Sequence, residues 1–365
     1  MSAAISSWAR RVAASLAPAA VVIAALLMPA FAPPAASAAP VIFPVCIQSG
    51  GQAGPDIAGD MAVWTDNRNG NLDIYGRYLS SKKDFAVCTN PAGQDNPSVA
   101  KRTIGGKTHY IVVWVDDRNT SATSGATDIW GRDMTAKTDS FPISPKNTAT
   151  LKWYPEISDN WVVWVEATTA AGLYTIMARD LDAPLSKKNP YKVATSKVLS
   201  PLGVSSRIVK GKTVHTAVYS SASGDISGRD LPGGTPFAIA QTAKFEWSPD
   251  ISGDRVVWWQ TGGRVMIRNL ATGKTAFVAL GARPRIDGKL VAWDRGGHGG
   301  TFTIAYAKNA AIYVRNVAAK NASTITLAQK DQSCLFPALS GHTVVWETGP
   351  ARRVLSHIHI YGARL

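Results

Sequence analysis

A ten-residue pattern of the form P-x-I-x-G-x-x-V-V-W recurs along the chain and limits the folds that it can adopt. Residues 55–64 and 249–258 show it most clearly, because they agree almost letter for letter. The copies, five close and two divergent, lie at residues 55–64, 97–114, 155–164, 207–219, 249–258, 284–293 and 337–346. Self-similarity at such intervals is typical of repeat architectures.

Two further elements follow the first one in a fixed order. The second, typified by D-I-Y-G-R, is found at residues 73–79, 128–134, 176–181, 225–231, 265–270, 312–317 and 359–365. The third is short and rich in β-forming residues, and it is found at residues 85–88, 141–144, 191–194, 237–240, 277–280 and 324–327. The chain ends before a seventh copy of the third element can follow.

A matching segment near the start of the chain supplies the missing copy. Residues 43–46 share their pattern with residues 85–88, and each segment ends in a cysteine nine residues before the proline of the next repeat. An unpaired strand edge favours aggregation, and ring closure removes that edge. We therefore predict that residues 41–48 pair with the C-terminal strand.

Each repeat is expected to form four strands, with tight Gly-Asp or Gly-Lys turns between the first and the second. The hydrophobic runs are β-branched and aromatic, and turn residues interrupt them too often for helices. The Trp or Tyr that ends each second strand recurs every 35 to 55 residues, a spacing that suits one four-stranded blade. The sequence predicts an all-β protein, a seven-bladed β-propeller that fills residues 39–365 as a single domain.

The first 38 residues have the three parts of a secretory signal peptide. Arg10 and Arg11 form the basic region, residues 12–27 form the apolar region, and Ala36-Ser37-Ala38 supplies the small residues before the cleavage site. We therefore expect a secreted, extracellular protein, exported by the general secretory or the twin-arginine route. No other apolar run approaches the ~20 residues of a membrane span, so none is expected after cleavage.

The mature chain is expected to be strongly cationic. Lys and Arg number 39 against 25 Asp and Glu, a net charge of +14. Loss of Arg10 and Arg11 leaves 37 against 25, a charge of +12. Such a surface favours polyanions, for example acidic glycans or wall polymers, although a soluble surface without a charged partner is an equal alternative. Export disfavours nucleic acid as the partner.

Three cysteines, Cys46, Cys88 and Cys334, remain after the signal peptide. An exported chain can oxidise one pair, which leaves one thiol over. Cys46 belongs to the strand that closes the ring and Cys334 to the entry of the same blade, so a Cys46–Cys334 disulfide is predicted. Cys46–Cys88 is disfavoured, because the outer edges of neighbouring blades diverge beyond the ~7 Å limit between Cα atoms.

The run D-N-R-N-G-N-L-D-I-Y-G at residues 66–76 resembles the repeat of TolB-like β-propellers, as does P-D-I-S-G-D-R-V-V-W at residues 249–258. The resemblance covers nearly all of the mature chain and implies the propeller fold. The family includes periplasmic interaction proteins, surface-protein modules, and propellers attached to peptidases or polysaccharide lyases. Because residue 43 is already assigned to the propeller, we do not expect the envelope-contact role of the separate N-terminal domain of TolB itself.

Acidic residues around the hairpin between the second and third strands are candidate calcium ligands, since calcium requires several converging oxygens. They are Asp66 and Asp73 around Arg68, and Asp116, Asp117 and Asp128 around Arg118. The alternative is structural, because Asn69-Gly70 is typical of a type I′ turn and an Asp–Arg pairing across it is common. The structural interpretation is favoured and no metal site is assigned.

Histidines are candidates for metal binding or ligand contact. His357 and His359 alternate in the last strand and would share a face. His359 takes the place of Asp73 in the first repeat, so a structural role is favoured. His298 lies in a Gly-rich loop next to Arg295, and inserted loops on a rigid scaffold often carry function. We predict that His298 and Arg295 contact the ligand, and that the loop at residues 120–127 contributes.

No nucleophile, zinc-protease or phosphate-loop motif occurs. The sequence therefore predicts a monomeric binding or interaction module, without an assigned cofactor, for an extracellular polymer or an envelope protein. The alternative is a polysaccharide lyase or glycoside hydrolase, whose catalytic side chains would come from several blades.

Overall fold

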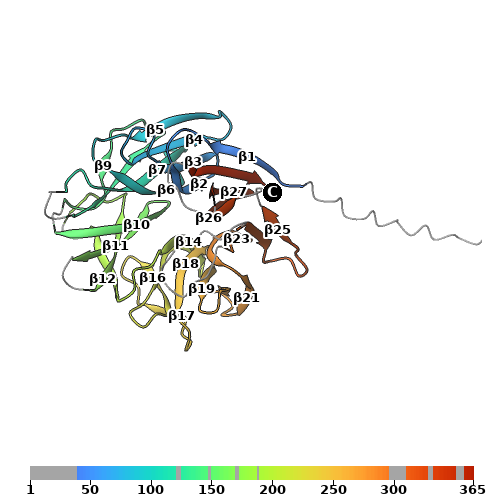
Figure 1. The fold of residues 1–365 in the computed structure, drawn as a ribbon. Coiled ribbons are helices and arrows are strands. Elements are labelled where there is room, and N and C mark those ends of the chain that lie inside the picture. The colour runs from blue at the N-terminus through green and yellow to red at the C-terminus, as the bar shows by residue number, and fades with distance from the viewer. Residues whose placement is uncertain are drawn as a thin grey trace, which may run out of the picture. The chain divides into compact units, whose positions relative to one another are not determined.

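The computed structural model describes residues 39–120, 125–146, 149–168, 172–186, 189–295, 310–327, 332–350 and 357–365. These residues form seven antiparallel sheets of four strands each, arranged as blades around an axis (Figure 1). The chain divides after Ala38, and the blades belong to the unit Ala39–Leu365. The described residues contain no helix long and apolar enough to cross a bilayer.

Within each blade the strands follow one another from the innermost to the outermost. Blades 1 to 3 consist of β2 (Gln52–Ala58), β3 (Met61–Asp66), β4 (Asp73–Tyr78), β5 (Lys83–Cys88); β6 (Gln94–Ile104), β7 (Lys107–Asp116), β8 (Asp128–Asp133), β9 (Phe141–Pro142); and β10 (Thr150–Ser158), β11 (Trp161–Thr168), β12 (Tyr174–Asp180), β13 (Tyr191–Ser196). Blades 4 and 5 consist of β14 (Gly203–Val209), β15 (Lys212–Ser220), β16 (Ile226–Leu231), β17 (Phe237–Ala240); and β18 (Glu246–Ser252), β19 (Arg255–Gln260), β20 (Arg264–Asn269), β21 (Thr275–Leu280). Blades 6 and 7 consist of β22 (Ala282–Asp287), β23 (Leu290–Asp294), β24 (Ile312–Asn316), β25 (Thr324–Leu327); and β26 (Ser333–Ser340), β27 (Thr343–Gly349), β28 (His359–Arg364), β1 (Val41–Cys46).

The first strand of the described chain completes the last blade. β1 pairs antiparallel with β28, with Val41 opposite Arg364 and Cys46 opposite Ile360. Figure 1 shows the blue strand β1 beside the red C-terminal strand. The innermost strands also contact one another in sequence around the axis, and β26 of blade 7 contacts β2 of blade 1. The predicted seven-bladed propeller, closed by its N-terminal strand, is confirmed.

The second strand of each blade is buried on both faces, because each blade is covered by two neighbours. All residues of β3 are buried, which explains why the V-V-W element is a continuous apolar run. The indole at its end fills the space between blades: Trp114 of blade 2 packs in one cluster with Met61 and Val63 of blade 1.

Hydrogen bonds between neighbouring blades line the axis at the turns between first and second strands. The turn amide of one blade donates to a side chain of the preceding blade, as from Gly288 to Ser252 Oγ at 2.9 Å. The same bond closes the ring, where Gly59 N donates to Ser340 Oγ at 2.9 Å. These bonds bring the turns together at one end of the axis.

A second set of bonds joins the blades at their outer edges. An arginine in the third strand donates to a carbonyl in the outer strand of the preceding blade. Arg132 donates to Val87 O at 2.8 Å and Arg268 to Ile239 O at 3.0 Å. The arginine of the G-R element therefore has a structural role.

The predicted Cys46–Cys334 disulfide is wrong. Cys46 lies in the outermost strand of blade 7 and Cys334 in the innermost, with β28 and β27 between them. Three strand spacings of about 4.8 Å put the two residues roughly 14 Å apart, beyond the reach of a disulfide. Cys334 Sγ lies instead 3.7 Å from Thr348 Oγ1.

Candidate functional site

A ring of seven side-chain positions faces the axis, one from each innermost strand. Each residue of this ring pairs with the residue immediately before the Trp or Tyr of the second strand, as Asp56 pairs with Val63. The ring consists of Asp56, Ser98, Glu156, Gly203, Asp250, Arg285 and Ala338. All of these residues except Gly203 directly follow a proline and occupy the variable position of the P-x-I element.

Blade 4 departs from the predicted alignment. The sequence pattern places its repeat at residues 207–219, but the strand pairing puts Gly203 in the ring, opposite Val218. The reason is that the hairpin of β14 and β15 is longer than most others, so its turn lies farther from the ring.

Part of the ring has a structural role. Asp56 Oδ2 accepts a hydrogen bond from Val99 N of the next blade at 2.8 Å. Asp250 Oδ2 accepts one from Ile286 N at 2.8 Å, and its Oδ1 accepts one from Ile251 N at 2.8 Å. The aspartate of the Pro-Asp-Ile element therefore links consecutive blades.

An ion pair joins two blades that are three apart in the ring. Arg285 Nη1 of blade 6 lies 2.8 Å from Glu156 Oε1 of blade 3. Both side chains are half-buried and line a cavity of about 400 Å³ to which all seven innermost strands contribute. With Asp56 and Asp250 in the same cavity, three carboxyl groups face one guanidinium group at the ring positions.

Burial and mutual repulsion change the acidity of these groups. Burial raises the pKa of Asp56 to about 6, and the charge of Glu156 adds to the effect while Arg285 opposes it. Burial likewise raises the pKa of Asp250 to about 6, with Arg285 opposing. Burial would lower the pKa of Arg285, but the surrounding carboxylates raise it. Arg285 is therefore charged, and the two aspartates take up protons near pH 6.

This acidity predicts that the protein is more stable at about pH 5 than at about pH 7.5. A raised pKa in the folded state contributes stability that is present below the unfolded value near 4 and lost as the pH rises through 6. The expected difference between the two pH values is about 1 to 1.5 kcal/mol for each aspartate, because part of the effect is already lost at pH 5. Urea unfolding at both pH values measures it. Asp250→Asn should reduce the difference, and an unchanged pH dependence in this variant would contradict the assignment.

The exposed lysines lie mostly at one end of the axis. We call this end the lysine face; it carries the turns between first and second strands and between third and fourth strands. Its exposed lysines are Lys82, Lys83, Lys101, Lys107, Lys137, Lys210, Lys212, Lys274, Lys289 and Lys320. The described part of the opposite end exposes Lys146, Lys197 and Lys244, and Lys192 is exposed in the outer strand β13. Among the described residues, no salt bridge involves a lysine of the lysine face.

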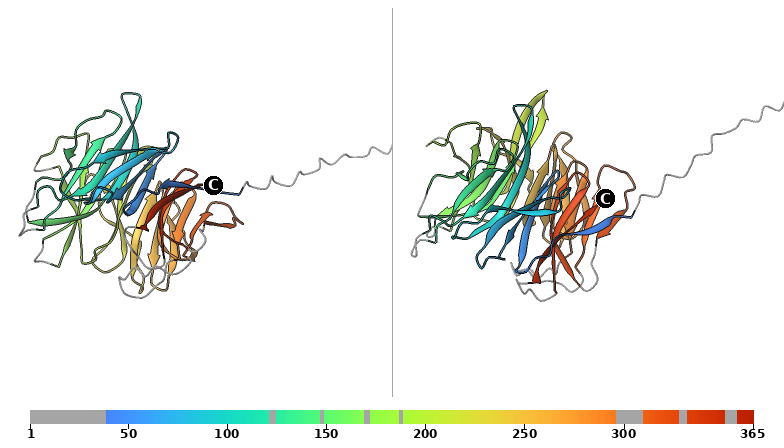
Figure 2. Two further views of the ribbon diagram at one scale, coloured as in Figure 1. Left: turned by 45° about the horizontal axis from the view of Figure 1, so that its top comes forward. Right: turned by 90° about the horizontal axis from the view of Figure 1, so that it is seen from above.

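Two long hairpins extend the lysine face. They are formed by β6 with β7 and by β14 with β15, and Figure 2 shows them projecting beyond the other turns in its right-hand view. Lys101 and Lys107 belong to the first hairpin, and Lys210 and Lys212 to the second. Near the tips, Ile104 is 39% and Ile208 63% exposed. The hairpins thus present cations and apolar side chains together.

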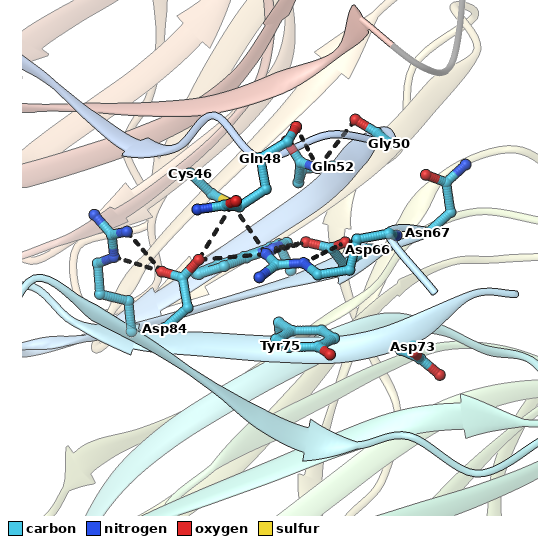
Figure 3. Close-up of polar contacts among 12 residues, drawn as sticks. Cys46, Gln48, Gly50, Gln52, Asp66, Asn67, Asp73, Tyr75 and Asp84 are labelled. Atoms are coloured by element: carbon cyan, nitrogen blue, oxygen red, sulfur yellow. Dashed lines mark hydrogen bonds and ion pairs between the residues drawn. The ribbon is translucent and has the colours of Figure 1, made fainter. Parts of the chain in front are cut away.

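Two of the acidic residues considered for calcium, Asp66 and Asp116, are held by arginines. Arg68 Nε and Nη2 donate to the two oxygens of Asp66 at 2.9 and 2.6 Å, and its guanidinium group stacks on Tyr75 at 4.1 Å. Trp64 Nε1 donates to Asp66 Oδ2 at 2.9 Å. Figure 3 shows this cluster, in which Asp73 points away from Asp66. Asp73 accepts a bond from Asn69 at 2.7 Å.

The second blade repeats this arrangement. Arg118 donates to both oxygens of Asp116 at 2.8 and 2.7 Å and stacks on Trp130 at 3.8 Å. Asn119 donates to Asp128 at 2.8 Å, as Asn69 does to Asp73. Asp117 lies beside Gly93, on the connection from the preceding blade. No group of three or more His, Cys, Asp or Glu within the described ranges is placed to hold a metal ion.

The candidates His359 and Arg295 lie at the end of the axis opposite the lysine face. His359 pairs with Thr348, as Asp73 pairs with Asp66, and its Nδ1 lies 3.1 Å from Gln52 Oε1. Burial lowers the pKa of His359, and the charge of the nearby His357 lowers it further. Arg295 stacks on Tyr313 at 4.8 Å, and its Nε donates to Leu280 O at 3.1 Å. His298 lies outside the described residues, as do residues 121–124 of the other loop.

No protein-family profile and no curated protein sequence matches this chain. Several solved structures do. An oligogalacturonate lyase from Vibrio parahaemolyticus aligns with a TM-score of 0.58 at 10% identity, over 88% of this chain and 93% of that one. The acylaminoacyl peptidase of Pyrococcus horikoshii aligns with a TM-score of 0.53 at 8% identity, over 87% of this chain and 52% of that one.

TolB from Acinetobacter baumannii, the namesake of the repeat that the sequence resembles, is also among the similar structures. It aligns with a TM-score of 0.46 at 12% identity, over 73% of this chain and 62% of that one. Identities near 10% show a shared fold and nothing finer. Together with the seven four-stranded sheets, the likeness to the lyase shows that the chain is a seven-bladed β-propeller.

Proposed function

We propose that this protein is a binding module for an extracellular anionic polymer, and that the polymer lies on the lysine face. The observation that carries the proposal is the uneven distribution of lysines: the exposed ones gather around the turns at one end of the axis, without carboxylate partners among the described residues. Exposed lysines that form no salt bridge attract a polyanion over long range.

The two long hairpins support this choice of face. Lys101, Lys107 and Lys212 belong to paired strands and Lys210 to the turn between two of them, so β-pairing orders the backbone that carries these lysines and less backbone entropy is lost on binding. Ile104 and Ile208 add apolar contact area beside the charges. The acidic ring at the axis would repel a polyanion, which favours contact with the rim of this face over entry into the cavity.

A neighbouring structure suggests the chemistry of a first probe. Oligogalacturonate, the substrate in the name of the Vibrio enzyme, is a chain of acidic sugars. Sodium polygalacturonate is therefore a suitable polyanion, and dextran is its neutral control.

The decisive comparison is between two sets of lysine substitutions. Lys101, Lys107, Lys210 and Lys212, all changed to Gln, should weaken binding of polygalacturonate about tenfold or more, because each lost charge contact contributes a few tenths of a kcal/mol or more. Lys146, Lys197 and Lys244, changed to Gln, form the matched control on the opposite end and should leave the affinity within twofold. Titration calorimetry measures both. Equal losses in the two variants would contradict the proposal.

The same samples distinguish binding from catalysis by a lyase or glycoside hydrolase. Polygalacturonate is incubated with the protein and its chain length is measured by size-exclusion chromatography. A binding module leaves the length unchanged, whereas shortening of the polymer would overturn the assignment as a module without activity.

A further inference from the structure

The junction between blades 7 and 1 contains a carboxylate enclosed by cations. Asp84 Oδ1 lies 2.6 Å from Arg77 Nη2, and its Oδ2 lies 3.3 Å from Arg68 Nη2. Cys46 Sγ lies 3.6 Å from Asp84 Oδ2, as Figure 3 shows. With Asp66 bound to Arg68, this cluster contains two guanidinium groups and two carboxylates, so its charges balance.

The junction between blades 1 and 2 has the same plan without the enclosed carboxylate. Strand pairing aligns the two blades, because Phe85 lies opposite Gly76 and Phe141 opposite Gly131. Ser140 therefore takes the place of Asp84. The other corresponding residues are Arg132 for Arg77, Arg118 for Arg68, Asp116 for Asp66 and Cys88 for Cys46.

A cavity lies where the carboxylate is missing. Its volume is about 370 Å³, and its lining includes Cys88, Arg118, Arg132 and Ser140. This volume falls within the range of small-molecule sites. In blade 1 the corresponding space holds the side chain of Asp84, which the shorter side chain of Ser140 does not fill.

The arginines in this cavity have fewer acidic partners than their counterparts. Arg118 keeps its bonds to Asp116, but its Nη1 reaches only the neutral Ser140 Oγ at 3.3 Å. Arg132 donates to the carbonyls of Thr138 and Val87, both at 2.8 Å, which do not cancel its charge. The acid in the described lining is Asp139, which is exposed and forms no salt bridge within 4.0 Å in the described structure. An anion in the cavity would restore the balance found in blade 1.

We propose that the cavity between blades 1 and 2 binds a small carboxylate, whose oxygens take the place of the Asp84 carboxylate beside Arg118 and Arg132. Arginine recognises carboxylates through planar, paired hydrogen bonds. The hydroxyl group of Ser140 provides a further donor at the same position. This site lies at the outer edge of the ring, beside the connection between β8 and β9, and does not depend on the proposed function.

The first test restores the carboxylate within the chain. Acetate, replacing chloride at constant ionic strength, should raise the Tm of the wild-type protein by about 2 to 4 °C when the site is saturated. Ser140→Asp should show no response to acetate, because its own carboxylate fills the site. An equal response in both proteins, or none in the wild type, would overturn the proposal.

The converse variant keeps the test informative if Ser140→Asp does not fold. Asp84→Ser removes the enclosed carboxylate of blade 1 and should lower the Tm in chloride. Acetate should recover part of this loss and give a larger total shift than in the wild type, because two cavities now bind it. A total shift no larger than that of the wild type would contradict the proposed equivalence of the two junctions.

The source of the carboxylate is resolved by comparing acetate, galacturonate and galactose. If acetate and galacturonate give half of the maximal Tm shift at the same concentration, the site recognises the carboxylate alone. If galacturonate does so at a lower concentration, the site recognises an acidic sugar. Either result supports the proposal. A response to galactose equal to that of galacturonate would overturn it, because galactose carries no carboxylate.

Alkylation of Cys88 gives a readout that does not depend on stability. Iodoacetate carries a carboxylate and iodoacetamide does not; in both cases the thiolate displaces iodide and forms a C–S bond. The rate ratio of iodoacetate to iodoacetamide at Cys88, obtained by peptide mapping, should fall several-fold in Ser140→Asp. A ratio that does not change would contradict an anion site next to this thiol.

Discussion

A chain that lacks residues 41–48 is expected to unfold roughly 10 °C below the intact protein. The deletion removes Val45 and Cys46, which are 0% and 1% exposed, together with the contact of Phe43 with Gly362. Burial of a large apolar side chain contributes about 1.5 to 3 kcal/mol, so the loss is expected to reach about 3 to 6 kcal/mol. The deletion also exposes the edge of β28, so the variant should self-associate.

Differential scanning calorimetry and light scattering measure these two effects. A chain that begins at Val41 is the control, because it retains all of β1. If the shortened protein were monomeric and had the same Tm as the control, closure of the ring by β1 would contribute nothing to stability. The account of blade 7 would then be wrong.

Replacing Arg285 with Met is expected to lower the free energy of unfolding by roughly 2 to 4 kcal/mol at about pH 7.5. The substitution leaves Glu156, Asp56 and Asp250 close together without the cation that compensates them. The loss should be smaller at about pH 5, because Asp56 and Asp250 have pKa values of about 6 and become protonated there.

A double-mutant cycle separates the ion pair from the loss of packing. Glu156→Met in the Arg285→Met background should cost less than the sum of the single substitutions, since an apolar pair replaces an ion pair without leaving a charge unpaired. Chemical denaturation at the two pH values provides the data. Additive costs, or a cost that does not depend on pH, would show that these groups do not interact across the axis.

The fold was predictable because its determinants are local and repeated. The continuous apolar V-V-W run indicates a strand that is buried on both faces, and the glycine after P-x-I indicates the turn. Six short outer elements follow the repeats, so a seventh is expected, and residues 43–46 supply it. Even the arginine of the G-R element is visible in the repeat, although its bonds to the preceding blade are visible only in three dimensions.

The site was less accessible to sequence reasoning, because its members come from different blades. Asp56, Glu156, Asp250 and Arg285 occupy one repeat position, and tabulating that position across the copies would have revealed the acidic ring with its single arginine. The lysines that lie next to turn glycines are a similar signal, because they place positive charge at the turns of the lysine face. The prediction of ligand contacts relied on inserted loops, which point to Arg295 at the opposite end of the axis, and it stays a prediction.

The disulfide prediction failed for a geometric reason. Cys46 and Cys334 were correctly assigned to one blade, but strand order within the blade places them on its outermost and innermost strands. Membership of a blade does not imply proximity, because a four-stranded blade is wider than a disulfide is long.

The lysine face is tested most directly by the salt dependence of binding to polygalacturonate. Binding that releases counter-ions weakens linearly in a plot of log K against log salt concentration, with a slope that grows with the number of charge contacts. The account predicts a steep slope for the wild type, a slope shallower by about 2 to 4 when Lys101, Lys107, Lys210 and Lys212 are changed to Gln, and an unchanged slope when Lys146, Lys197 and Lys244 are changed. A wild-type affinity that does not respond to salt, or a slope that falls equally in both variants, would contradict it.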